Sequence, residues 1–140
     1  MTTADLTPEA DPQVLVMDPD AFSRCQLVAS LSRLSDNVRG CVDLLEVLTR
    51  LRVDTPAVIV LVARPVQQPA WLAEIRLLTG QLPECPIVVL VDRDGEEQKC
   101  LGLSAGASEV MSVESGIPAL VAVVSGHVQR ASAATQFRGA

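Results

Sequence analysis

The chain has 140 residues, enough for one compact domain with a sizeable core, and 49% of them are apolar. Aromatic residues make up only 2%, so Val, Leu, Ile and Ala form the core, a mix that suits buried parallel strands better than a base-stacking surface. The formal net charge is −6, whereas domains that bind DNA or RNA directly are usually basic. We therefore expect no direct contact with nucleic acid.

The cysteines and the single histidine do not have the spacing of a metal site. No CxxC pair occurs among the four cysteines, and the histidine is distant from most of them in sequence; these residues are Cys25, Cys41, Cys85, Cys100 and His127. We therefore expect no metal and no cofactor, and we interpret the cysteines as buried free thiols of a reducing compartment.

The ends of the chain carry no signal for export. Residues 1–11 are polar and acidic and lack the apolar centre of a signal peptide, and we expect them to be disordered. No apolar run reaches the roughly 18 residues that a membrane crossing needs. We expect a cytoplasmic protein with one folded domain over residues 12–130, a flexible tail over 131–140, and no DNA-binding output domain within these 140 residues.

The first half of the chain predicts three strands and two helices. Residues 14–17 form a short apolar run that indicates a buried strand, after which Asp18 and Asp20 offer capping oxygens to a helix of about 14 residues. A weaker strand is predicted over 38–42, followed by a helix that Asp43 caps. Residues 57–62 are the most apolar run and indicate the central strand.

The second half continues the same alternation. A helix is predicted from Trp71 to about Gly80, a fourth strand over 87–91, and a short helix that Asp94 to Glu96 open and that ends near Gly106. A fifth short strand contains Val110 and Met111, and Ser115 is predicted to cap the last helix.

Five strand–helix units with strands that are apolar on both faces predict an α/β fold. We expect one doubly wound parallel sheet of five strands in the flavodoxin-like order 2-1-3-4-5, with helices on both faces. In this order a ligand site lies at the carboxyl ends of strands 1 and 3. No GxGxxG and no GxxxxGK[ST] sequence is present.

Four segments resemble bacterial response-regulator receiver domains, the CheY-like family. Residues 14–20 are similar to the acidic turn after their first strand, 56–62 to the strand that carries the phosphoacceptor, and 86–91 to the strand that carries a hydroxyl residue. Residues 102–111 are similar to the segment that joins their fourth helix to their fifth strand. The resemblance extends over roughly residues 12–130.

The resemblance implies five functional positions, and this chain keeps one of them. The first metal-binding acid falls on Asp18, but the second falls on Pro19. The phosphoacceptor falls on Val62, the hydroxyl residue on Val91 and the lysine on Val113. The phosphorylation pocket is thus degenerate, and the resemblance implies a pseudo-receiver that is not an enzyme. We expect the crevice to be closed and packed.

Ordinary structural roles explain most of the remaining polar residues. Asp18 is interpreted as a cap or turn carboxylate and Asp92 as a solvated turn residue. His127 needs no special role, and Gly102 and Gly106 indicate close packing and a helix end. The aromatic switch position of receivers falls on Val110, which cannot act as such a switch.

The expected function is therefore protein–protein interaction in two-component-type signal transduction or transcription regulation, independent of phosphorylation. The partner is expected to be a sensor kinase, an output domain or a regulator, and a homodimer is a candidate. The expected partner surface consists of Gln98, Lys99, Leu101, Glu109, Met111, His127 and Arg130. The alternative is a small-ligand sensor with an open pocket near Asp18, Arg64 and Asp92, where Arg64 would meet an anionic ligand.

Overall fold

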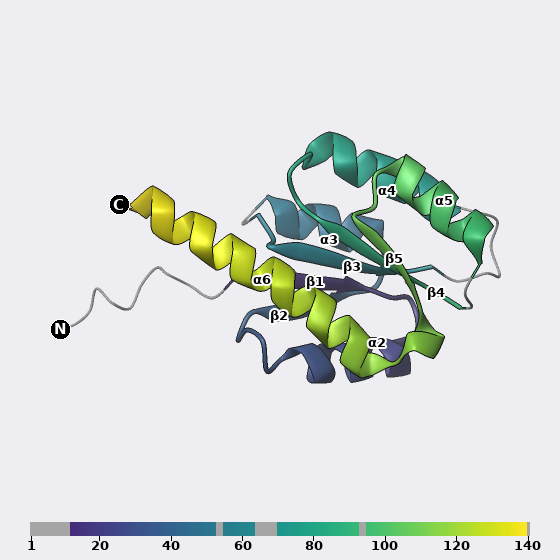
Figure 1. The fold of residues 1–140 in the computed structure, drawn as a ribbon, viewed down its shortest axis with the longest axis horizontal. Helices are drawn as coiled ribbons and strands as arrows, with labels where there is room; N and C mark the ends of the chain where they lie inside the picture. Colours follow the sequence, from purple (N-terminus) through teal and green to yellow (C-terminus); the bar gives the residue numbers. More distant parts are fainter. Residues whose placement is uncertain (1–11, 53–54, 64–69, 93–94, 140) are drawn as a thin grey trace.

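The fold is a five-stranded sheet with helices on both faces, seen in a computed structural model that describes residues 12–52, 55–63, 70–92 and 95–139 (Figure 1). The strands are β1 Val14–Met17, β2 Val38–Cys41, β3 Val58–Val62, β4 Ile87–Val91 and β5 Glu109–Ser112. The helices are α2 Ala21–Leu31, α3 Leu44–Leu51, α4 Ala70–Gln81, α5 Glu96–Ala105 and α6 Ile117–Gly139, with a 3₁₀ turn η1 at Val113–Ser115.

The sheet has the predicted topology. All neighbouring strands are parallel and lie in the order β2-β1-β3-β4-β5, which confirms the 2-1-3-4-5 expectation. The central strands β3 and β4 are fully buried along their length, as expected for apolar runs covered on both faces. Their carboxyl ends lie side by side, because Val62 pairs with Leu90 in the register.

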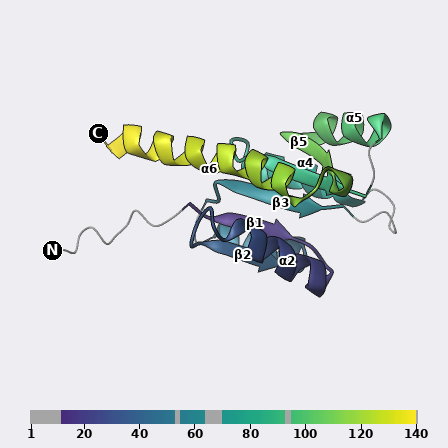
Figure 2. The ribbon, with the colours of Figure 1, turned by 60° about the horizontal axis from the view of Figure 1, so that its bottom comes forward.

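Alternate residues of the strands build two separate core layers. One layer packs the sheet against α3, α4 and α5 and includes Trp71 and Ile75. The other packs it against α2 and α6, where Leu27, Leu120 and Val124 meet strand valines. Figures 1 and 2 show α2 and α6 near each other on one side of the sheet, and α2 contacts α6 directly.

Two of the predicted helix starts are confirmed and one is wrong. The Asp20 side chain accepts the amide of Ser23 at 2.8 Å, and Asp43 accepts that of Glu46 at 3.0 Å. Ser115 does not cap the last helix, because a 3₁₀ turn precedes it and Ser112 caps that turn through the amide of Glu114. The sequence analysis missed this extra turn.

The last helix is longer than predicted. Helix α6 continues to Gly139, through the residues 131–139 for which a flexible tail is predicted, and its C-terminal half projects beyond the sheet (Figure 1). The limits of the domain itself stay a prediction. Among the described residues, no helix combines the length and the apolar character that a membrane crossing requires.

Two glycines of the α5 region have the structural roles that the sequence predicts. A methyl group at Gly102 would lie 2.7 Å from the Val110 side chain and 3.3 Å from the Trp71 ring, so helix and strand approach closely there. Gly106 ends α5 with a φ of 125°, a conformation that favours glycine.

The cysteines are free, but only some of them are buried. Cys41 is buried and Cys85 is half-buried, whereas Cys25 and Cys100 are exposed on α2 and α5. The expectation of buried thiols is therefore wrong for Cys25 and Cys100.

Candidate functional site

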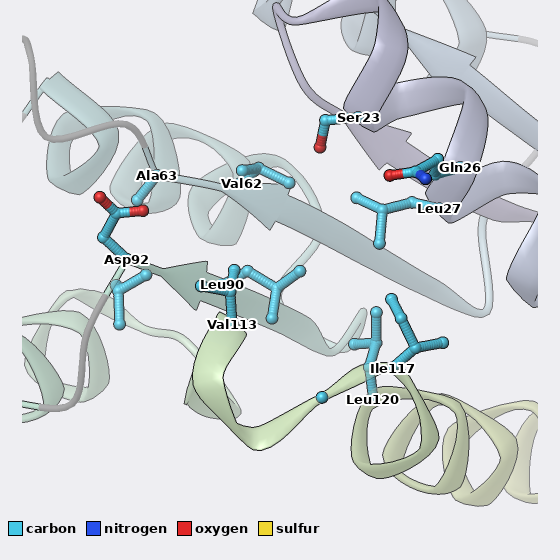
Figure 3. A pocket seen from close by; sticks show the side chains of 12 residues that line it. Ser23, Gln26, Leu27, Val62, Ala63, Leu90, Asp92, Val113, Ile117 and Leu120 are labelled. Atoms are coloured by element: carbon cyan, nitrogen blue, oxygen red, sulfur yellow. The ribbon is translucent and has the colours of Figure 1, made fainter.

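The three valines onto which the resemblance places the reactive positions of receivers meet at one pocket. Val62, Val91 and Val113 all line a hollow of about 260 Å³ at the carboxyl edge of the sheet (Figure 3). They come from the ends of β3 and β4 and from η1. Asp18 and Pro19, which the sequence places in the same site, are not among the residues that line it, and the hollow lies where a closed and packed crevice is expected.

The pocket lies between the first turns of α2 and α6 (Figure 3). Its apolar walls include Leu27 from α2, Leu90 from β4, and Ile117 and Leu120 from α6; Ser23, Gln26 and Asp92 supply its polar groups. The sequence analysis singled out only Asp92 of these. The hollow remains because short side chains and Gly116 line the space between the two helices.

Asp18 lies in the turn that follows β1. Asp18 is fully buried, and its carboxylate accepts the amide of Asp20 at 3.0 Å. Its amide donates to Cys41 at the end of β2. Pro19 is exposed beside it and has no side-chain oxygen. The turn-carboxylate interpretation of Asp18 therefore agrees with the hydrogen bonding.

A basic side chain also contacts this turn. The Arg24 guanidinium on α2 donates to the backbone carbonyl of Asp18 at 2.8 Å. The stem of Arg24 lies against Gly40 of β2, where a methyl group would approach it to 2.9 Å. The small residue at position 40 thus leaves room for an arginine that ties α2 to the acidic turn.

Val110, at the aromatic switch position of the resemblance, is buried in the core. Val110 is buried under Gly102 and Trp71, so its side chain belongs to the core and not to a mobile rim. A valine has one rotatable side-chain bond and cannot change from an inward to an outward position in the way that a long aromatic side chain does. The expectation that Val110 is no switch stays a prediction.

The predicted partner surface falls on three elements. Gln98, Lys99 and Leu101 lie on α5, Glu109 and Met111 on the edge strand β5, and His127 and Arg130 on α6. Met111 and Gln98 are half-buried, and Met111 packs on the α2–α6 core layer. The role of these residues in binding stays a prediction.

His127 has a local partner on its own helix. Its Nδ1 lies 3.1 Å from the Arg130 guanidinium. Partial burial lowers the pKa of His127, the positive charge of Arg130 lowers it further, and the carboxylate of Glu109 opposes them. Burial and Arg130 therefore favour the neutral imidazole, and Glu109 favours the protonated one.

Metal and anion sites receive no support from the described residues. In that part of the chain, no group of three or more His, Cys, Asp or Glu side chains is arranged to hold a metal ion. Arg64, the cation of the predicted ligand-sensor site, lies outside the described residues, and so does Asp94. Asp92 is exposed at the pocket, whereas Asp18 is not among its lining residues.

The fold is similar to that of solved receiver domains. The receiver domain of the Francisella response regulator 1452 superimposes with a TM-score of 0.73 at 22% identity, covering 86% of this chain and 99% of that one. The receiver domain of NtrX from Brucella abortus gives a TM-score of 0.73 at 19% identity, with 84% and 98% covered. A putative pilus assembly-related protein from Burkholderia pseudomallei gives 0.73 at 16%, with 89% and 94% covered.

These structural neighbours define the class of fold. The chain has the flavodoxin- and CheY-like architecture of response-regulator receiver domains, as the sequence predicts. No protein-family model matches the sequence, and no curated protein matches it. Because the identities are low, the likeness establishes the fold, and the activity must be argued from the pocket and the surface.

Proposed function

We propose that this domain is a receiver-like signalling module that works without phosphorylation and acts by binding another protein. Its setting is two-component-type signal transduction or transcription regulation, and its partner is a sensor kinase, an output domain or a regulator. The receiver fold supports the setting. The observation that carries the proposal is the meeting of Val62, Val91 and Val113 at one pocket.

The chemistry of phosphoryl transfer explains why these valines matter. The transferred group carries negative charge that positioned oxygens, a cation and Mg²⁺ must stabilise. Magnesium in turn needs carboxylate oxygens and water. A valine supplies no nucleophile, no hydrogen-bond donor and no charge, so three valines remove three contributions at once. A single neighbouring residue cannot replace all of them.

Asp18 and Asp92 do not supply the reactive groups that the three valines lack. Asp18 is buried and hydrogen-bonded within its turn. Asp92 is exposed at the end of β4, one residue beyond the position that holds a hydroxyl group in receivers. Asp92 is the acid to test, because it is the carboxylate among the described residues that line the pocket.

Exposure to acetyl phosphate with Mg²⁺ tests phosphorylation independence. We expect no phosphorylated species by phosphate-affinity electrophoresis, while an active receiver treated in parallel is modified. The Asp92→Asn variant shows whether a phosphoryl group taken up by the chain is attached to the Asp92 carboxylate. Stoichiometric, Mg²⁺-dependent modification that Asp92→Asn abolishes would contradict the proposal. Light scattering of the purified chain tests whether a second copy is a partner.

A small-ligand sensor is the second candidate function, and the pocket favours it. The pocket is open, apolar in its walls and equipped with Ser23, Gln26 and Asp92. Its volume of about 260 Å³ is below the roughly 300–1,000 Å³ usual for small-molecule sites, so we rank this candidate second. Neither candidate function involves catalysis, a metal or a cofactor.

A further inference from the structure

Strand β2 forms one open edge of the sheet. It pairs with β1 on one side, and no other described strand lies beside it (Figure 2). Asn37 and Cys41 direct their carbonyls toward β1, where they accept backbone amides at 2.9 and 3.0 Å. Because the backbone groups of successive strand residues point in opposite directions, Val38 and Gly40 direct theirs away from the sheet. This edge can therefore accept one more strand.

The unpaired stretch of β2 is short and accessible to solvent. Val38 and Gly40 are half-buried, and Arg39 between them is exposed. Two residues beyond Gly40, the Glu46 carboxylate already accepts the Val42 amide at 2.7 Å. Within the described part of the chain, the open edge therefore offers the N–H and the carbonyl of Val38 and of Gly40, a pattern that matches an extended peptide of a few residues.

Arginines gather around this edge in a chain that is acidic as a whole. Residues 24–52 contain five of the eleven basic side chains and three of the seventeen acidic ones, although the net charge of the chain is −6. Arg39 extends from β2 itself, and Arg50 lies in the last turn of α3. Neither guanidinium has a hydrogen bond or an ion pair among the described residues. The edge therefore carries positive charge that a partner can neutralise.

The Cys41 thiol shows that the charges of α2 and α3 reach the end of β2. Burial raises the pKa of Cys41 to about 11, and the charges of Glu46, Arg50 and Arg24 also act on this pKa. Glu46 and Arg24 are engaged in hydrogen bonds with backbone groups of neighbouring turns. Arg39 of β2 and Arg50 of α3 therefore remain available to a carboxylate.

The charge of the edge determines which kind of strand can join it. A symmetric antiparallel pairing of two copies that matches Val38 with Gly40 would put the two Arg39 side chains opposite each other, and like charges there are destabilising. A nucleic acid offers phosphates, but no groups that match the alternating donors and acceptors of a strand. An extended peptide with Asp or Glu satisfies both the backbone groups and the arginines, which bind carboxylates through paired hydrogen bonds.

We infer that the open edge of β2 is the site where the partner protein of the proposed function docks, by adding an extended acidic segment to the sheet. The segment forms hydrogen bonds with the backbone of Val38 and Gly40 and places a carboxylate beside Arg39 or Arg50. This inference rests on the proposed function and deepens it. It moves the contact from the predicted surface on α5, β5 and α6 to the opposite edge of the sheet.

A synthetic peptide of alternating valine and glutamate tests the inference by NMR titration of the full chain. We expect saturable shifts of the amide signals of Val38, Arg39 and Gly40. The same peptide with its amides N-methylated keeps the charge but loses the backbone donors, and a peptide of alternating valine and lysine reverses the charge. Both control peptides are expected to bind about tenfold more weakly or less tightly still.

Two exposed arginines form a matched pair of variants. Arg39 lies on β2 and Arg76 on α4, and both are exposed. Arg39→Glu is expected to weaken binding of the glutamate peptide by about tenfold or more, whereas Arg76→Glu leaves it within about twofold. Thermal melting checks that both variants fold. Arg39→Gln removes the charge without reversing it and is expected to weaken binding in the same direction.

Several results would overturn the inference, and they are distinct from failure of the proposed function. Saturable shifts confined to α5 or β5 would place the acidic peptide at the other edge of the sheet, with protein binding retained. Equal binding of the N-methylated peptide, or of a single-stranded oligonucleotide of the same charge, would show attraction by charge alone. The absence of any saturable shift would show that β2 takes up no acidic strand. Phosphorylation by acetyl phosphate would instead contradict the proposed function.

Discussion

Individual side chains at the carboxyl edge show how this fold accommodates apolar residues at the ends of its central strands. Val62 is 8% exposed and belongs to the α2–α6 core layer, while Val91 belongs to the opposite layer. Both positions end central strands, where a valine packs well and an unpaired carboxylate is costly to bury. The two valines therefore suit the stability of the sheet.

A close approach at Gly102 gives a prediction at the residue scale. Gly102→Ala places a methyl group 2.7 Å from Val110, so we expect unfolding free energy to fall by about 1–3 kcal/mol, measured by urea denaturation. In a Val110→Ala background the closest contact of the added methyl is the Trp71 ring at 3.3 Å, and the loss is expected to be smaller. An equal loss in both backgrounds would contradict the packing argument.

Gly80 is the matched control, because it also lies in a helix but has open space around the added methyl group. Gly80→Ala is expected to stabilise the domain by about 0.5 kcal/mol through the reduced freedom of the unfolded chain. A loss of stability at Gly80 would show that helical glycines of this chain resist substitution for another reason.

At the scale of the elements, the local sequence predicts the first residues of a helix best. The Asp43 carboxylate accepts the amide of Glu46 at 3.0 Å, and the Glu46 carboxylate accepts that of Val42 at 2.7 Å, so the two side chains satisfy free amides reciprocally. Such contacts depend on residues close in sequence, and the prediction at Asp43 was therefore possible without a structure.

Removal of this cap tests its contribution to helix α3. Asp43→Ala is expected to cost about 1 kcal/mol of unfolding free energy, because the amide that it accepts loses its partner. Glu84→Ala, at an exposed turn before β4, is expected to change stability by less than about 0.5 kcal/mol. Equal effects of the two substitutions in chemical denaturation would contradict the capping role.

Sequence reasoning predicted the strands, their order and the capped helices, because these depend on apolar runs and local signals. It did not find η1, since one extra turn after β5 depends on the Ser112 side chain and on Gly116, whose φ is 91°. It expected a closed crevice as the leading interpretation and included an open pocket only in the ligand-sensor alternative. The hollow depends on how far α2 and α6 stand apart, which no local pattern encodes.

At the scale of the whole molecule, the free energy of unfolding is expected to fall at alkaline pH because the thiols of Cys41 and Cys85 have raised pKa values. Burial raises the pKa of Cys85 to about 12, and burial with nearby Glu46 raises that of Cys41 to about 11. The folded state thus keeps protons that the unfolded chain releases above its ordinary thiol pKa of 9.0. Stability from this source is present below pH 9.0 and is lost as pH rises toward these folded values.

We therefore expect unfolding free energy under reducing conditions to decline steadily above about pH 9. The chain has no tyrosine and Lys99 is its only lysine, so few other groups titrate in this range. Cys85→Ala is expected to flatten the decline. A Cys85→Ala profile as steep as that of the unmodified chain would exclude the thiol as a main cause.

The same burial predicts which thiols react in the native state. A colorimetric thiol reagent is expected to modify Cys25 and Cys100 rapidly, because both are exposed, and to reach Cys41 and Cys85 only after denaturation. Peptide mapping after a short exposure assigns the modified residues. Early modification of Cys41 would contradict its buried position at the end of β2.

The measurement that tests the central claim most directly is the response of the valine methyl signals to beryllofluoride and Mg²⁺. Beryllofluoride imitates a phosphoryl group on an acceptor carboxylate. We predict no saturable, Mg²⁺-dependent shift at Val62, Val91 or Val113, since these three residues supply neither acceptor nor charge. A saturable shift that requires both ions and spreads to Val110 would show a working phosphorylation switch and contradict the account.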